Sequence, residues 1–590
     1  MTHRRKGPPP KPRIRPWRQW HNAPRFGFKA LPGLPPLLPT AVETPYALPA
    51  RSVRAALIDL VLLALCVGVA GALSVWMGQD VNWDLQNYHY YIGWAWWHDH
   101  RAYAQDIAAA QLQTYHNPLL DLPFYLMVEA RWSPPAIAFA LAAPAGIAAF
   151  LLIKTVPLLF GELPRQERRL ASLCAVAIGL TSAMGVGVLG TTMNEWPGAA
   201  LTMAAVYVLV RALVRAPGAA IPAAPLVASG VLAGLANGSK FTYGVFAVGL
   251  CLGILWRGPI KWGYILRAWK EAIVFGLGVL AGTALTAGAW MWALWTQFRN
   301  PIFPYGNIWI KSPWWGVYEA MGRPYGPHKF LEWVVFPFTL VSPPPFYVSE
   351  VQYTDPRLTL LCALAVIAGF AALAPRLMPP WRGRAAPAAR RGEVWRVLGL
   401  FFVITFLLWT AQSSILRYLV PLFMLSGALI VALLRHVARP AIAPSAMVLV
   451  TIVLIASTRV QDWGRADFGP AWFDVKMSAP DKNALVLLTS QEPMSYVLPF
   501  FPPDARFLGI NNSISDAKRK TLMEEAIVRS IREHRGPIYS LSYPRHGGID
   551  ALLARGLLQV TETCVEIVTN LRTSPIEMCR VVRASDGRAP

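Results

Sequence analysis

Long apolar segments recur along most of the chain and constrain its fold more than any other feature. The first runs from Leu57 to Trp76, and ten more follow at about 135–153, 170–190, 197–213, 223–237, 240–256, 271–295, 357–375, 396–411, 415–434 and 441–458. A helix of about 17 to 25 apolar residues can span a bilayer. Because 55% of the 590 residues are hydrophobic and only 15% are charged, the composition agrees with this interpretation. The sequence therefore predicts a mainly α-helical, polytopic membrane protein with about eleven crossings.

Basic residues follow a pattern that orients these crossings. They gather in the first 54 residues and in four connections between apolar segments, around 154–169, 257–270, 376–396 and 435–439. Lys and Arg are enriched in the cytoplasmic loops of membrane proteins. Placing all five stretches in the cytoplasm sends residues 77–134, residues 298–356 and everything after 459 to the other face. Orientation thus explains the net charge of +23, and no nucleic-acid partner is predicted.

Three regions follow from this topology. Residues 1–54 form a basic, Pro-rich cytoplasmic tail without a signal-peptide cleavage site, expected to be disordered near anionic membrane lipids. Residues 55–458 form the membrane domain. Residues 459–590 lack long apolar runs and combine short β-branched segments with a helical stretch, which predicts a small α/β domain outside the cytoplasm. In it, Cys564 and Cys579 lie around a predicted turn, and either a cross-strand disulfide or two thiols fits the sequence.

The two long outer loops, 77–134 and 298–356, are the predicted location of the functional site, because long ordered connections are uncommon unless they carry function. The first loop opens with "DVNWDLQNYHYY", which contains Asp80 and Asp84. A spacing of four places two carboxylates on one face of a helix, where either could act as a base on a substrate at the membrane surface. The alternative is an interfacial belt of aromatic side chains with polar anchors.

Three basic residues are candidates for binding an anionic group. Lys240 and Arg417 lie at the outer ends of predicted helices, and Lys311 lies in the second outer loop. A cation at such a depth is costly unless it is paired, and Arg can bind a phosphate through two nitrogens. The alternative is that these side chains snorkel to the interface.

Polar residues of the outer face complete the predicted site. Arg101 and Asp106 are a candidate ion pair. The histidine spacings match no compact ligand pattern, so no metal or other cofactor is predicted, although the sequence leaves a divalent cation open. The candidate substrate-binding residues are Asn87, Tyr88, His89, Arg101, Asp106, His116, Asn117 and Glu195.

Five motifs, in this order, resemble the GT-C class of polytopic membrane glycosyltransferases of the bacterial type. They are "DVNWDLQNYHYY", "NEWPGAA" at 194–200, "GLANGSK" at 234–240, "NPIFPYGN" at 300–307 and "RYLVP" at 417–421. The resemblance implies a polyprenyl-phosphate-linked sugar donor and an acceptor that is a glycan, a lipid or a protein. It also implies a bacterial inner (cytoplasmic) membrane, with the C-terminal domain in the periplasm.

The same resemblance implies a mechanism. A catalytic aspartate, Asp84 or Asp80, would remove a proton from the acceptor hydroxyl, and Arg417 would hold the donor phosphate. The transfer would invert the anomeric carbon and would need no metal. The family's frequent pair of adjacent acidic residues is absent here, which leaves the choice between the two aspartates open.

Two other functions compete with glycosyl transfer. A transporter or flippase of lipid-linked saccharides requires charged or interrupted helices at mid-membrane depth, and these are scarce in the sequence. A polysaccharide polymerase or ligase would use paired arginines in the outer loops, of which the sequence has few. The sequence therefore favours a glycosyltransferase.

Overall fold

The computed structural model describes residues 53–584, apart from 260, 317–324, 378–391, 479, 516 and 545–547. Residues 58 onward group into one compact unit. Nearly all of the predicted tail 1–54 lies outside the described residues, as does most of the basic connection 376–396. The predicted domain boundaries, at 54/55 and 458/459, therefore stay predictions.

Helices occupy every segment predicted to cross the membrane. Among the described residues, six stretches are long and apolar enough to span a bilayer: α1 (Val53–Met77), α5 (Pro134–Leu159), α8 (Glu195–Arg215), α11 (Trp262–Phe298), α15 (Gly392–Gln412) and Leu416–Val437, which includes α16 (Val420–Val437). The other predicted segments fall on α6 (Arg165–Leu180), α9 (Ala223–Ser239), α10 (Gly244–Leu255), α14 (Arg357–Leu377) and α17 (Ala443–Ser457). The chain is thus a mainly helical membrane protein, and the count of eleven crossings remains a prediction.

The apolar segment predicted at about 170–190 is divided between two helices. α6 ends at Leu180, and α7 (Ala183–Gly187) begins after Ser182, whose hydroxyl caps it. The buried guanidinium of Arg357 donates to the carbonyl oxygens of Ile178 and Thr181, at 2.9 and 2.8 Å. These carbonyls belong to the last turn of α6, which lacks intrahelical donors. A buried arginine thus ends the helix at a point where hydropathy alone would continue it.

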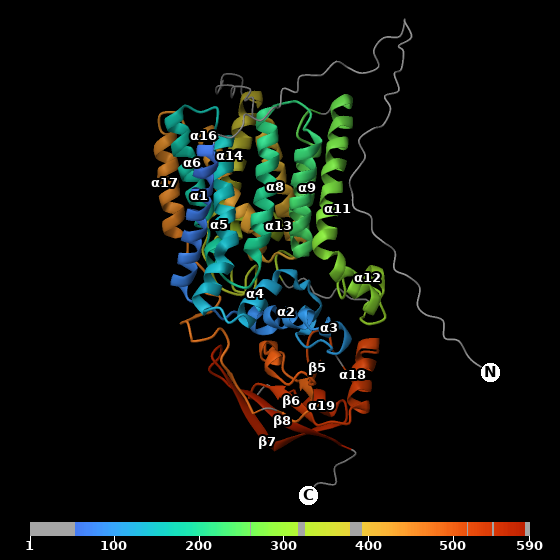
Figure 1. Ribbon diagram of the computed structural model, residues 1–590. Coiled ribbons are helices and arrows are strands. Elements are labelled where there is room, and N and C mark those ends of the chain that lie inside the picture. The colour runs from blue at the N-terminus through green and yellow to red at the C-terminus, as the bar shows by residue number, and fades with distance from the viewer. Residues whose placement is uncertain are drawn as a thin grey trace, which may run out of the picture. The chain divides into compact units, whose positions relative to one another are not determined.

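Glycines allow α9 and α11 to pack closely. A Cβ atom on Gly234 of α9 would lie 2.2 Å from the carbonyl oxygen of Val279, and one on Gly238 would lie 2.7 Å from that of Thr283. Small residues four apart let the backbones of membrane helices approach each other, and Figure 1 shows α9 and α11 side by side. This packing fixes the end of α9, which Lys240 follows directly.

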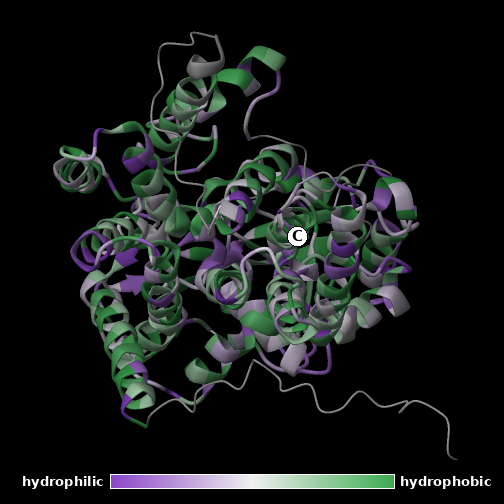
Figure 2. Ribbon diagram, turned by 90° about the horizontal axis from the view of Figure 1, so that it is seen from above, coloured by the Kyte–Doolittle hydropathy of each residue, from purple (hydrophilic) through white to green (hydrophobic). Residues whose placement is uncertain are grey.

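Apolar side chains cover the outside of the long helices. Figure 2, a view from above, shows that most helical residues are hydrophobic. Exposed large apolar side chains on α1 and α11 include Ile58, Val61, Leu65, Leu73, Leu277, Leu280 and Leu285. In a membrane protein such surfaces face the hydrocarbon of the bilayer, which carries no penalty for apolar exposure.

The two outer loops fold into short elements. The first contains β1 (Gln79–Asp80), the π-helix η1 (Leu85–His89), α2 (Tyr90–Trp97), α3 (Arg101–Ala104), the 3-10 turns η2 (Gln111–Tyr115) and η3 (Pro118–Leu120), and α4 (Leu122–Glu129). The second contains α12 (Asn307–Ile310) and α13 (Phe330–Thr339). In Figure 1, α2 and α3 lie between the long helices and the C-terminal strands.

The C-terminal region combines strands and helices, as predicted. Its six-stranded sheet has the order β3–β7–β8–β6–β4–β5, in which β4 is parallel to β5 and β6 while β8 is antiparallel to β6 and β7. A disulfide joins Cys564 on β7 to Cys579 on β8. The elements are β2 (Arg465–Ala466), β3 (Val475–Lys476), β4 (Leu485–Leu488), η6 (Ser495–Phe500), β5 (Arg506–Gly509), α18 (Leu522–Glu533), β6 (Ile538–Ser542), α19 (Ile549–Leu553), β7 (Leu557–Thr569) and β8 (Ile576–Arg583).

Backbone pairing connects this region to the first outer loop. β1 pairs antiparallel with β2, and Ile107 forms a parallel bridge to Leu508 of β5. The bridge adds a short segment of the loop to the β5 edge of the sheet, and a covered edge is protected from pairing with other chains. The first outer loop is thereby held from both sides, by the helices and by the sheet.

Candidate active site

Arg417 is the centre of a buried cluster of charges. It lies in the 3-10 turn η5 (Leu416–Leu419) that precedes α16. Its guanidinium donates to Oδ2 of Asp84 at 3.0 Å, to Oε1 of Glu195 at 3.1 Å and to both carboxylate oxygens of Glu350 at 3.3 Å. The structure thus brings together one residue from each of the two outer loops, one from the start of α8 and one from the turn before α16.

Glu195 links Arg417 to a second cation. The ammonium of Lys240 donates to Oε2 of Glu195 at 2.5 Å and to the carbonyl oxygen of Met193 at 2.9 Å. The Glu195 side chain is 0% exposed. A buried carboxylate needs such partners, because an unpaired buried charge is very costly. Lys240 is therefore paired with protein, not snorkelling to the interface.

The "NEWPGAA" motif shapes this part of the site. Asn194 adopts the left-handed conformation (φ 64°) directly before α8, which Asn tolerates better than most residues. The hydroxyl of Tyr243 donates to the carbonyl oxygen of Glu195 at 2.5 Å. A Cβ atom on Gly198 would lie 2.3 Å from the Tyr243 ring, so glycine at this position leaves room for the tyrosine.

Asp84 presents a partly accessible carboxylate. Its side chain is 12% exposed, and within the described part of the chain its one hydrogen bond is the contact of Oδ2 with Arg417. Burial raises the pKa of Asp84, but the charge of Arg417, with a smaller contribution from Lys240, outweighs burial and holds that pKa below its usual range. Asp84 is therefore ionised, with Oδ1 available to another molecule.

Asp80 has a different environment. Oδ1 accepts from the backbone N–H of Asn82, the side-chain amide of Asn82 contacts both oxygens, and Oδ2 accepts from the N–H and the hydroxyl of Thr192 at 2.8 and 2.9 Å. The side chain is fully buried. The expectation that Asp80 and Asp84 share one helical face is wrong, because Asp80 ends the strand β1 and hydrogen-bonds to the loop before α8.

Histidines of the first loop lie beside Asp84. Nδ1 of His89 is 2.6 Å from Oδ1 of Asp121. Nε2 of His116 is 2.7 Å from the Tyr305 hydroxyl. Burial, together with the charge of Lys240, lowers the pKa of His116 to about 3, so the His116 ring is neutral. The Tyr88 ring packs against both imidazoles, with centroid distances of 4.0 and 5.4 Å.

The two predicted asparagines have structural contacts. The amide of Asn117 donates to the carbonyl oxygens of Gly238 and Thr286 at 2.7 and 2.9 Å, which ties the loop to α9 and α11. The amide of Asn87 donates to Gln113 at 3.2 Å. Both residues therefore hold the first outer loop in place beside the cluster.

Arg101 and Asp106 form the predicted ion pair, whereas their assignment to substrate binding stays a prediction. Their side chains meet at 2.9 Å, and the guanidinium also donates to the carbonyl oxygens of Pro503 and Ala505. Asp106 accepts from the N–H of Phe507 at 3.0 Å. Because both side chains are buried against the C-terminal region, they join the loop to the sheet.

Lys311 is not part of the cluster either. It lies exposed after α12, in the left-handed conformation (φ 58°). Within the described ranges no hydrogen bond or ion pair of its ammonium connects it to Asp84 or Arg417. The surroundings of Lys311 offer no support for a role in binding the donor phosphate.

Two residues beside Arg417 were not among the predicted site residues. Glu350 lies near the end of the second outer loop, which contains several acidic residues, and no sequence pattern distinguished Glu350 from the others. Trp463 lies after α17, and its ring is 5.4 Å from the Arg417 guanidinium carbon, while its indole N–H has no partner in the part of the chain that the structure describes. Glu350 and Trp463 lie too far along the chain from the five motifs for a local sequence pattern to show that they contact Arg417.

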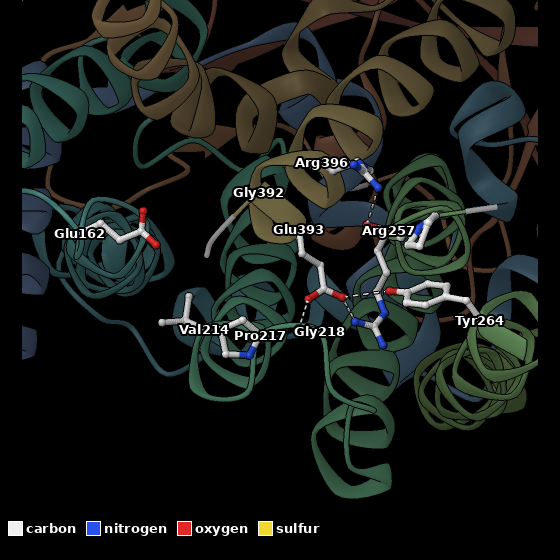
Figure 3. Close-up of a pocket in the computed structure, with 11 residues that line it drawn as sticks. Glu162, Val214, Pro217, Gly218, Arg257, Tyr264, Gly392, Glu393 and Arg396 are labelled. Atoms are coloured by element: carbon white, nitrogen blue, oxygen red, sulfur yellow. Dashed lines mark hydrogen bonds and ion pairs between the residues drawn. The ribbon is translucent and has the colours of Figure 1, made fainter. Parts of the chain in front are cut away.

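A separate cavity of about 900 Å³ lies at the ends of α8 and α10 that are far from the Arg417 cluster (Figure 3). Glu393 forms its centre, accepting from Tyr264 at 3.1 Å and from the N–H of Gly218 at 2.7 Å and pairing with Arg257. Arg257 comes just after α10, whereas Lys240 precedes it, and α10 is about 18 Å long at 1.5 Å per residue. The cavity thus belongs to the predicted cytoplasmic side, away from Asp84.

No group of three or more His, Cys, Asp or Glu side chains is arranged as a metal site among the residues that the structure describes. In the cluster, guanidinium and ammonium groups take the positions next to the carboxylates. The site as it stands offers cations for an anionic group and a carboxylate for a proton.

Comparisons with protein-family models and with curated protein sequences give no match to this chain. Solved structures do match. The apo oligosaccharyltransferase of Archaeoglobus fulgidus aligns over 82% of this chain and 69% of its own, with 11% identity and a TM-score of 0.42. ArnT from Cupriavidus metallidurans aligns over 90% and 99% in the apo state (14% identity, TM-score 0.39), and over 89% and 97% when bound to undecaprenyl phosphate (13%, 0.36).

Proposed function

We propose that this chain is a membrane glycosyltransferase that moves a sugar from a polyprenyl-phosphate donor to an acceptor hydroxyl at the outer, periplasmic face of a bacterial inner membrane. The observation that carries the proposal is the ion pair of Asp84 with Arg417. It lies where the membrane helices meet the first outer loop. A lipid-borne donor and a water-borne acceptor can both reach that level.

Arg417 and Lys240 are proposed to hold the donor phosphate. The cluster contains three carboxylates and two cations, so its net charge is −1 (2 − 3) when all five groups are ionised. A phosphate therefore enters most easily by replacing a carboxylate. Glu350 is the one to be displaced, because its side chain is 34% exposed and its contacts of 3.3 Å with Arg417 are the longest in the cluster.

Asp84 is proposed to act as the general base, and Asp80 to have a structural role. The free Oδ1 of Asp84 can accept the proton of the acceptor hydroxyl as that oxygen attacks the anomeric carbon. The bond from this carbon to the phosphate oxygen breaks, and its electron pair leaves with the polyprenyl phosphate, so the carbon is inverted. Cations beside the leaving phosphate stabilise the charge that develops there, and a positioned base contributes about 10² to 10⁴ in rate.

The test is sugar transfer from a panel of radiolabelled polyprenyl-phosphate sugars, measured with membranes at matched expression. We expect Asp84→Asn to lose at least about 10²-fold in transfer and Arg417→Ala to require more donor. Asp99→Asn, an exposed aspartate of the same loop, is the matched control and should transfer like the wild type. Full transfer by Asp84→Asn would show that this base is wrong, and movement of intact lipid-linked saccharide without transfer would favour a flippase.

A further inference from the structure

The local fold places His89 on the same side of the chain as Asp84. Residues Leu85–His89 form a π-helical turn that begins after Asp84. Hydrogen bonds in a π-helix close from residue i to i+5, and such turns are found frequently at functional sites. A π-helical turn takes more residues than an α-helical turn, so residues five apart diverge by less than the about 140° that separates them in an α-helix of 3.6 residues per turn. The turn therefore brings His89 closer to the side of the helix on which Asp84 lies.

The Nδ1 edge of the His89 ring is fixed by hydrogen bonds. Nδ1 is 2.6 Å from Oδ1 of Asp121, and the Asn194 amide donates to the same oxygen at 2.6 Å. The Asn194 amide nitrogen also lies near Nδ1, but at 3.4 Å it is much farther away than the carboxylate oxygen. A carboxylate can only accept, so Nδ1 carries the hydrogen of the neutral ring. The other nitrogen, Nε2, is then a proton acceptor.

This acceptor is buried and has no partner. His89 is 2% exposed, and Nε2 makes no hydrogen bond with any residue that the structure describes. Buried polar atoms are nearly always paired, so an exception calls for an explanation. The charged and titratable groups around the ring are Asp84 and Tyr88 from its own turn, Asp121 and His116 from the same loop, and Lys240 from the end of α9. None of these groups forms a hydrogen bond with Nε2.

We propose that His89 is a second proton-transfer residue of this site, and that Nε2 receives the proton which Asp84 removes from the acceptor hydroxyl. The proposal rests on the glycosyl transfer proposed above. The proton passes from the acceptor oxygen to Asp84 during the attack and then to Nε2, which leaves His89 as an imidazolium and Asp84 as a carboxylate. Asp84 thereby regains its ion pair with Arg417, and the imidazolium releases its proton to water after product leaves.

Asp121 has the matching positioning role. A carboxylate on Nδ1 holds the imidazole in one tautomer and stabilises its protonated form, as in Ser-His-Asp enzymes. An amide at position 121 could donate to Nδ1 and thus move the ring hydrogen to Nε2. Asp121→Asn should therefore disable proton transfer without removing the histidine.

The first arm of the test does not depend on activity. ¹⁵N-histidine-labelled protein is studied by NMR, and the His89 signal is assigned by its loss in His89→Gln. The proposal expects the Nδ1–H tautomer in the wild type and the Nε2–H tautomer in Asp121→Asn. A ring hydrogen on Nε2 in the wild type would overturn the proposal, whether or not the protein proves to be a glycosyltransferase.

The second arm measures transfer as a function of pH. We expect His89→Gln to lower transfer by about 10²-fold and to change the dependence of the rate on pH, because a glutamine side chain does not gain or lose a proton. His89→Ala should be partly rescued by added imidazole. His98→Gln, an exposed histidine of the same loop, is the control and should keep the wild-type profile. If the wild type transfers sugar and His89→Gln retains both rate and profile, His89 is not in the proton path. If the wild type transfers nothing, the proposed function fails instead.

Discussion

The contrast between Asp80 and Asp84 gives a prediction that separates fold from chemistry. Asp80 accepts hydrogen bonds at both oxygens from Asn82 and Thr192. In Asp80→Asn one of these oxygens becomes an NH₂ group, which cannot accept. At least one side of the interaction, either Thr192 or Asn82, then loses its acceptor in a fully buried position.

The expected cost follows from those lost bonds. Each buried donor without an acceptor costs about 1 to 3 kcal/mol, and at least two donors meet each oxygen: two at Oδ1 and three at Oδ2. Asp80→Asn should therefore lower the free energy of unfolding by about 2 to 6 kcal/mol. Asp84→Asn keeps an oxygen that can accept from Arg417, and the guanidinium keeps its contacts with Glu195 and Glu350. Because the change also relieves the carboxylate excess of the cluster, it should cost only about 1 kcal/mol.

The assay is thermal unfolding of both variants and the wild type in the same detergent. We expect a clearly lower midpoint for Asp80→Asn and a near wild-type midpoint for Asp84→Asn, together with loss of transfer only in the latter at temperatures where both are folded. The reasoning is refuted if Asp80→Asn melts like the wild type. It is also refuted if folded Asp80→Asn loses transfer as completely as Asp84→Asn.

Three further predictions concern stability. Glu195→Gln leaves Lys240 and Arg417 without their shared, fully buried carboxylate and should cost about 3 to 5 kcal/mol; an unchanged melting midpoint would contradict the pairing. Gly198→Ala places a methyl group 2.3 Å from the Tyr243 ring and should cost about 1 to 3 kcal/mol, whereas Gly263→Ala, where a Cβ meets no atom within 4 Å, is the control. The Cys564–Cys579 disulfide closes a loop with a sequence separation of 15, worth about 3 kcal/mol; a reductant should lower the melting midpoint of the wild type but not of the double alanine variant.

Much of the membrane architecture could be predicted because helices that lie in lipid must be apolar over their whole length. The ends of the helices were harder to predict. The end of α6 depends on Arg357, a residue nearly 180 positions away that binds its last carbonyls. No local pattern around residues 178–181 contains that information.

The candidate site was predictable in part for a similar reason. Asp84, Glu195, Lys240 and Arg417 each belong to a short motif at the outer end of an apolar segment, and such ends must meet at one level of the membrane. Glu350 has no such motif, and the choice between Asp80 and Asp84 depends on Thr192, which lies on another element. Arg101 and Asp106 were correctly paired from their spacing, but only the fold places them against the C-terminal sheet.

The central claim is that Arg417 binds the donor phosphate and that Asp84 acts on the acceptor. It is tested most directly by measuring the Kd of a sugar-free polyprenyl phosphate for purified wild type, Arg417→Ala, Asp84→Asn and, as an exposed control, Arg459→Ala. We expect Arg417→Ala to bind about 10- to 100-fold more weakly, since hydrogen bonds to charged groups contribute about 1.5 to 3 kcal/mol. Arg459→Ala should bind as tightly as the wild type. Asp84→Asn should bind at least as tightly as the wild type. Wild-type affinity in Arg417→Ala would contradict the account.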